Sequence, residues 1–240
     1  LEAINVGSID YGTVGEAPPI FALAAGADLV YIANEPAALK AEAVLVRKDS
    51  PIQSPAGLKG KKVAVAKGSN ANYLLVKVLE KAGLKFSDIQ PVYLAPADAR
   101  AAFESGAVDA WSIWDPYLAA TQTQLAARTL ADATGVANNY QYFLAARSYA
   151  QKSPEIIQAV VEETARIDAW GAQNPKEVGA FLAKEVGLDL ATAELAASRL
   201  AYGIQPISDA VLADQQRVAD TFHEFKLIPK KVVVKNATLH

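Results

Sequence analysis

The sequence of 240 residues contains no cysteine and no methionine, and its only histidines are His223 and the terminal His240. Without cysteine there is no disulfide, thiolate metal site, iron–sulfur cluster or cysteine nucleophile. A histidine-rich metal site or a Ser-His-Asp triad would depend on His223, whose surroundings in residues 220–225 favour a solvated helix face instead. We therefore expect no metal, no cofactor and a poor set of catalytic groups.

An excess of charge of one sign is also missing. The chain carries 23 Lys and Arg against 26 Asp and Glu, a net charge of −3. Nucleic-acid binding depends on a broad positive field, so we expect no nucleic-acid partner. No stretch approaches the roughly 18 uninterrupted apolar residues that a membrane helix requires. What is present is a hydrophobic share of 52%, which predicts a globular chain with a sizeable core and one or two domains.

The first half of the chain alternates strand-like and helix-like segments. The strand-like runs are residues 9–14, 29–33, 42–47, 62–66, 91–94 and 108–113. The helix-like segments are residues 18–25, 70–82, 97–104 and 116–124. This alternation predicts an α/β fold with a parallel sheet. Beyond these segments the pattern becomes mostly helical, with helix-start signals at Ser153, Asn174 and Ser208.

Three strand-to-helix junctions open with small or capping residues, at residues 15–19, 67–71 and 114–117. Free backbone N–H groups at a helix start, together with the positive end of the helix dipole, offer a site for an anion. In an open α/β sheet such junctions lie at the carboxyl ends of the strands, where the ligand crevice forms. Because Lys67 is the only basic residue at these junctions, a singly charged sulfonate or carboxylate fits better than a phosphate.

The same residues also have simpler explanations. Ser69, Asn70 and Asp115 are ordinary helix-capping residues. Trp114 either fills a core or forms an apolar wall of a cleft. Glu16 would repel an anion, so it either accepts hydrogen bonds from helix-start amides or meets a positive or polar tail of a ligand. The spacing of the motifs leaves these alternatives open.

Three longer motifs carry a resemblance to a known family. Residues 7–22, 58–71 and 108–117 resemble the periplasmic aliphatic-sulfonate-binding proteins of ABC importers, within the nitrate, sulfonate and taurine solute-binding protein family. The resemblance implies a type II periplasmic binding protein. Such a protein has two α/β lobes, each a mostly parallel sheet flanked by helices, which close around the ligand.

The resemblance also implies where the lobes lie along the chain. The first lobe would consist of residues 1–41 and 140–240, and the second of residues 42–139. We expect the first lobe to be N-terminally incomplete, because the family begins with a strand, a helix and a second strand ahead of the segment that resembles residues 2–10. Glu42 to Arg47 and Tyr140 to Ala145 would be the two crossover strands.

The function implied by the resemblance is that of a non-catalytic, monomeric receptor that delivers an aliphatic sulfonate to an ABC permease. Such a receptor is periplasmic, or extracytoplasmic and membrane-associated. The ligand-binding residues that it implies are Gly15, Glu16, Ala17, Ser69, Asn70, Ala71, Trp114, Asp115 and Tyr142. Arg147 either contacts an anion or forms a structural ion pair.

Other functions remain as alternatives on the same scaffold. They are an enzyme resembling a desulfinase or a pyrimidine-forming protein, a binder of nitrate, taurine or a thiamine precursor, and the sensing module of a regulator. The lack of cysteine and of clustered histidine disfavours the enzymes.

Overall fold

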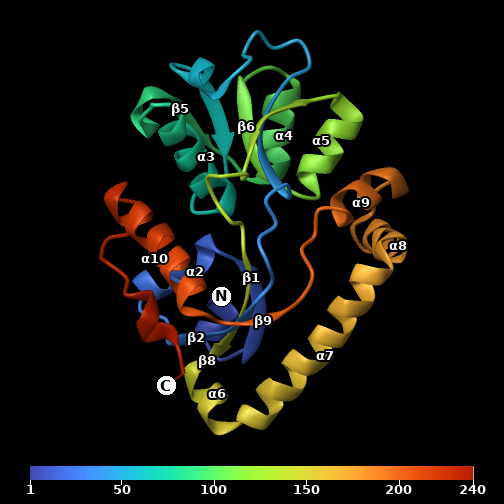
Figure 1. Ribbon diagram of the computed structural model, residues 1–240. Helices are drawn as coiled ribbons and strands as arrows, with labels where there is room; N and C mark the ends of the chain where they lie inside the picture. The colour runs from blue at the N-terminus through green and yellow to red at the C-terminus, as the bar shows by residue number, and fades with distance from the viewer. Residues whose placement is uncertain (240) are drawn as a thin grey trace. The chain divides into compact units, whose positions relative to one another are not determined.

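A computed structural model describes residues 1–239. His240, the second of the two histidines noted in the sequence, lies outside the described residues. The chain divides into two compact units (Figure 1). The first unit comprises Leu1–Ala37, Tyr140–Gln173 and Ala201–His240, and the second comprises Ala38–Asn139 and Asn174–Leu200. Each unit contains one β-sheet flanked by helices, which confirms the predicted α/β class.

The sheet of the first unit is antiparallel in every described strand pair. Its order is β1-β8-β2-β9, with the bounds Tyr11–Gly15, Gln141–Ala146, Leu29–Asn34 and Gln205–Pro206. The helices of this unit are α1 (Glu2–Asn5), α2 (Ala17–Ala24), α6 (Arg147–Lys152), α7 (Pro154–Gln173) and α10 (Asp209–Glu224), followed by the 3-10 turn η3 (Val234–Ala237). The prediction of a mostly parallel sheet is therefore wrong here. β1 and β2 do run in the same direction, but β8 returns from much later in the chain and pairs between them in the opposite direction.

The sheet of the second unit is mixed. Its order is β5-β4-β6-β3-β7, with the bounds Gln90–Tyr93, Lys62–Val65, Ala110–Trp114, Glu42–Val46 and Arg128–Asp132. The helices of this unit are α3 (Asn70–Lys81), α4 (Pro96–Glu104), α5 (Tyr117–Leu125), α8 (Pro175–Val186) and α9 (Leu190–Ala197), with the 3-10 turns η1 (Pro55–Leu58) and η2 (Phe86–Asp88). The β4-β5 and β4-β6 pairs are parallel, as the strand–helix alternation predicts, whereas β3 pairs antiparallel to both β6 and β7.

The core of the second unit lies on both faces of its sheet. Successive side chains of a strand point to opposite faces. On β3, Val44 and Val46 belong to one buried cluster with Leu74 of α3, whereas Leu45 belongs to the other with Phe103 of α4. All of these side chains are fully buried. A strand buried on both faces accounts for the continuous apolar run that the sequence shows there.

These units differ from the predicted lobes in two places. The passage out of the first unit falls after Ala37, rather than after residue 41. Residues 174–200 also belong to the second unit, where α9 packs against α5 and the hydroxyls of Thr123 and Thr192 lie 2.7 Å apart. Nothing in the local pattern of residues 174–200 marks the side on which these helices pack. Within residues 1–239, no helix combines the length and the apolar character that crossing a membrane requires.

The contact between α8 and α9 generates a prediction about Gly179. A Cβ atom at this position would lie 2.8 Å from Cγ and 3.0 Å from Cα of Glu194, so α9 would have to shift. Gly179→Ala should therefore lower the free energy of unfolding by about 1–3 kcal/mol. In an exposed helix the same change would raise it by about 1 kcal/mol.

Urea unfolding followed by circular dichroism measures this difference. Ala180→Ser, a change at an exposed position on the same helix, serves as the control and should have little effect. A stabilised Gly179→Ala variant would contradict the close packing of α8 on α9.

Candidate functional site

The junction between β1 and α2 places a buried carboxylate at a helix start. Glu16 is the residue before α2, and its side chain is 2% exposed. Oε2 of Glu16 accepts a hydrogen bond from the backbone N–H of Tyr140 at 3.2 Å, and its backbone carbonyl accepts one from Nε2 of Gln215 at 2.7 Å. The side chain makes no capping hydrogen bond to α2, so the predicted capping role is not the one seen. Glu16 instead connects the start of α2 to Tyr140, the residue before β8, and to α10.

A cluster of tyrosines lies beside this carboxylate in the first unit. Tyr142 of β8 is fully buried, with its ring centroid 4.9 Å from that of Tyr31 and 6.0 Å from that of Tyr140. Burial, reinforced by the charge of Glu16, raises the pKa of Tyr142 far above its usual value. The phenol is therefore a hydrogen-bond donor at any ordinary pH.

The two buried tyrosine hydroxyls of this cluster differ in their partners. The hydroxyl of Tyr31 accepts a hydrogen bond from Nε2 of Gln215 at 2.8 Å. The hydroxyl of Tyr142 is buried and makes no hydrogen bond to any residue in the described range 1–239. A buried donor without a partner is costly in the free protein and available to a ligand.

The junction between β4 and α3 is a capped helix start in the second unit. Oγ of Ser69 accepts the N–H of Asn72 at 3.2 Å, and Oδ1 of Asn72 accepts the N–H of Gly68 at 3.1 Å. Nδ2 of Asn70 donates to Oδ1 of Asn139 at 2.8 Å, and the buried Ala71 accepts a hydrogen bond from the Ser112 hydroxyl through its carbonyl. These contacts hold the first turn of α3 in place, and its amides carry the positive end of the helix dipole.

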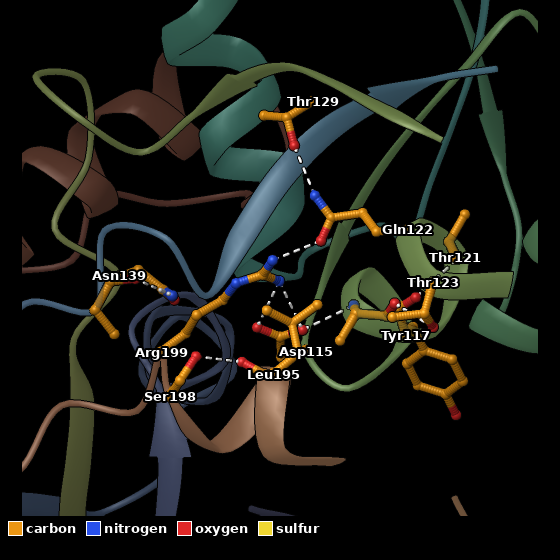
Figure 2. Close-up of polar contacts among 12 residues, drawn as sticks. Asp115, Tyr117, Thr121, Gln122, Thr123, Thr129, Asn139, Leu195, Ser198 and Arg199 are labelled. Atoms are coloured by element: carbon orange, nitrogen blue, oxygen red, sulfur yellow. Dashed lines mark hydrogen bonds and ion pairs between the residues drawn. The ribbon is translucent and has the colours of Figure 1, made fainter. Parts of the chain in front are cut away.

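The junction between β6 and α5 places Trp114 and Asp115. Trp114 is the last residue of β6; it is partly buried, and its ring contacts that of Tyr117 edge-on with centroids 6.5 Å apart. Asp115 accepts the N–H of Ala119 at 2.9 Å and forms an ion pair with Arg199 at 3.2 Å (Figure 2). Burial raises the pKa of Asp115 to about 6, although Arg199 and the N–H of Ala119 act to lower it.

The structure distributes the predicted site residues over both units. The first unit contains Gly15, Glu16, Ala17 and Tyr142, and the second contains Ser69, Asn70, Ala71, Trp114 and Asp115. Within the first unit, Glu16 and Tyr142 lie close enough for the charge of Glu16 to raise the pKa of Tyr142.

Of the two roles considered for Arg147, an anion contact or a structural ion pair, the structure shows the ion pair. Its Nε lies 2.7 Å from Oδ1 of Asp28, and its Nη atoms donate to the carbonyls of Asn236 and Thr238. It therefore fixes the C-terminal segment of the chain. His223 lies in the last turn of α10, and the described residues 1–239 contain no group of His, Asp and Glu arranged to hold a metal ion.

Some residues that build these junctions were missed in the sequence. Tyr31 and Gln215 shape the cluster around Glu16, and Arg199 pairs with Asp115. Their partners are 84 to 199 positions away in the chain, so no local motif marks them.

Comparison with known proteins identifies the family. The model of the NMT1/THI5-like family matches residues 1–178. This chain belongs to the NMT1/THI5-like family.

Two relatives match nearly the whole chain. A putative aliphatic sulfonates-binding protein of Escherichia coli K12 is 50% identical over 239 residues, which cover 98% of this chain and 74% of the relative. A protein of the same description from Bacillus subtilis 168 is 33% identical over 236 residues, which cover 98% of this chain and 71% of the relative.

Solved structures agree with these relatives. The periplasmic aliphatic sulphonate binding protein SsuA of E. coli has a TM-score of 0.95 and 48% identity, covering 100% of this chain and 78% of that one. The alkanesulfonate-binding protein SsuA of Xanthomonas axonopodis pv. citri, bound to MOPS, has a TM-score of 0.92 and 42% identity, covering 99% and 83%. The desulfurization enzyme DSZB shares only 20% identity and shows the fold alone. The chain is thus similar to binding proteins rather than to enzymes.

The hydroxyl of Tyr31 has a hydrogen-bond partner and that of Tyr142 has none among the described residues, and this difference generates a prediction about stability. Tyr31→Phe removes the hydrogen bond from Gln215 and should lower the free energy of unfolding by about 1 kcal/mol. Tyr142→Phe removes a buried hydroxyl without a partner among the described residues and should leave the free energy of unfolding unchanged or raise it. Urea unfolding of both variants beside the wild type measures the two values. An equal loss in both variants would contradict this difference.

Proposed function

We propose that this chain is the solute-binding component of an ABC importer, which captures an aliphatic sulfonate in the periplasm and delivers it to the permease. The observation that carries the proposal is the match over the whole chain to the SsuA structure, with 48% identity and a TM-score of 0.95. The second SsuA structure, at 42% identity, holds MOPS, a zwitterion with a sulfonate group. We propose that the chain acts as a monomer.

The chemistry of the junctions supports an anion of this kind. A sulfonate is singly charged, weakly basic and rich in acceptor oxygens, so it suits N–H and O–H donors that carry no net charge. In the proposal, the first turn of α3 supplies backbone N–H groups and the Tyr142 hydroxyl supplies a further donor, whereas the first turn of α2 offers few because Pro18 and Pro19 have no N–H. The nearby cation Lys67 lies over the Tyr93 ring, 5.7 Å from its centroid.

Other parts of the ligand would meet other residues. Trp114 is only partly buried and offers an aromatic surface to an alkyl group. Glu16 keeps a carboxylate close to the Tyr142 hydroxyl, and it would attract the positive end of a zwitterion such as taurine or MOPS. The same carboxylate would repel sulfate, which carries two charges near neutral pH, more strongly than a singly charged sulfonate.

Isothermal titration calorimetry tests the ligand class. Short alkanesulfonates and MOPS should release heat with a stoichiometry of one, whereas sulfate and nitrate should not. Binding of nitrate or of a pyrimidine, without heat from any sulfonate, would overturn the assignment. Turnover of a sulfinate would favour the enzyme alternative.

A substitution tests whether Tyr142 contributes a donor to the ligand. Tyr142→Phe should weaken sulfonate binding about tenfold, because one hydrogen bond to a charged group is lost. Tyr149→Phe, which changes a partly buried tyrosine packed on another cluster of the same unit, should leave the affinity unchanged. Equal affinities of wild type and Tyr142→Phe would exclude Tyr142 from the ligand site.

A further inference from the structure

Arg199 lies just beyond the end of α9, far in sequence from the residues that it contacts. Its Nη1 lies 3.2 Å from each carboxylate oxygen of Asp115, and its Nη2 donates to Oε1 of Gln122 at 2.5 Å (Figure 2). Nε2 of Gln122 in turn donates to the Thr129 hydroxyl at 2.9 Å. One guanidinium therefore connects α9, the turn between β6 and α5, and α5 itself, all within the second unit.

The ion pair is largely withdrawn from water. The side chains of Arg199 and Asp115 are 14% and 7% exposed. A partly buried pair behaves unlike an exposed one, because removal of one partner leaves a desolvated charge without compensation. The carboxylate of Asp115 would then have to be protonated or turn toward water.

Asp115 fixes the turn that follows Trp114. Its backbone N–H donates to the carbonyl of Ala41 at 2.8 Å, and its carboxylate accepts the N–H of Ala119 in the first turn of α5. Trp114 is the preceding residue, and its backbone pairs with Glu42 in the β3-β6 ladder. Movement of the Asp115 carboxylate would therefore be transmitted directly to the end of β6 and to the Trp114 side chain.

We propose that Arg199 is a positioning residue for the ligand site, which holds Trp114 in place through Asp115 without itself contacting the ligand. This inference rests on the proposed function, because Trp114 is there assigned to the sulfonate site. It also gives residues 174–200 a role, since they bring Arg199 to the second unit. In this arrangement Asp115 is occupied by Arg199 and by the first turn of α5, and it is a support of the site rather than a ligand contact.

The test compares Arg199→Gln, Asp115→Asn and the double variant with the wild type. Arg100→Gln is the matched control. Arg100 also lies in the second unit, and it pairs with Glu104 and donates to Gln124 of α5, neither of which belongs to the turn after Trp114. Two readouts are needed: the ¹⁹F resonance of fluorotryptophan at position 114, assigned with Trp114→Phe, and the affinity for MOPS by calorimetry.

Arg199→Gln should shift the resonance of Trp114 in the ligand-free protein and weaken MOPS binding about tenfold or more. Asp115→Asn should act in the same way, and the double variant should bind no more weakly than Arg199→Gln alone, because both residues act through one contact. Arg100→Gln should change neither readout. If Arg199→Gln does not fold, Arg199→Lys keeps the charge but loses the bridge to both Asp115 and Gln122, and it should show the same shift and loss.

Three results would overturn the inference. An unmoved Trp114 resonance in the Arg199 variants would show that Arg199 does not position this side chain. A loss of MOPS affinity in the Arg199 variants no larger than that of Arg100→Gln would show that Arg199 does not support ligand binding. A further loss in the double variant would show that Asp115 contacts the ligand independently of Arg199. If the wild type binds no sulfonate, the proposed function fails, while the resonance of Trp114 still decides whether Arg199 positions it.

Discussion

The pairing of buried carboxylates is the constraint on which both units depend. An ionised carboxylate that leaves water loses several kcal/mol unless hydrogen bonds or an opposite charge replace its hydration. Glu16 accepts the N–H of Tyr140, 124 positions away, and Asp115 pairs with Arg199, 84 positions away. Asp168 of α7 accepts the N–H groups of Gly203 and Ile204. Each carboxylate is thus satisfied only when distant parts of the chain have come together, so the same contacts that hold the fold also place the junction residues.

A chain without cysteine must obtain its stability from packing and from such contacts. The second unit does so with a sheet whose central strands are buried on both faces, and with helices that approach closely where a glycine allows it. At the α8-α9 contact, Gly179 leaves room for the backbone of Glu194, which keeps α9 in the place from which Arg199 reaches Asp115. In the proposed role of Arg199, packing far from the junctions therefore has consequences for the position of Trp114.

Local signals in the sequence predict local structure well and pairing poorly. Ser69 and Ser208 accept N–H groups as helix caps, and the strand predicted over residues 42–47 occurs at Glu42–Val46. The direction of β8 could not be predicted, because its two neighbours come from the first 34 residues and only the folded unit brings them together. Contacts between residues far apart in the chain likewise explain why only part of the candidate site could be predicted. The residues before helix starts were found from their type, whereas Gln215 and Arg199 are defined by partners that no spacing rule connects to them.

In the proposed function, the arrangement around Glu16 would explain how a site with little positive charge selects a particular anion. A lysine or arginine would attract any anion, and more strongly a doubly charged one. Neutral donors attract an anion more weakly than a cation does, and a fixed carboxylate beside them repels doubly charged sulfate more strongly than a monoanion. Burial and the nearby charge of Glu16 both keep Tyr142 protonated, so its hydroxyl remains a donor. The N–H of Tyr140 donates to the Glu16 carboxylate, and this hydrogen bond opposes a turn of the carboxylate away from the ligand. In the proposed function, selectivity for a monoanionic sulfonate therefore follows from a negative group placed near neutral donors, rather than from a positive group placed near the ligand.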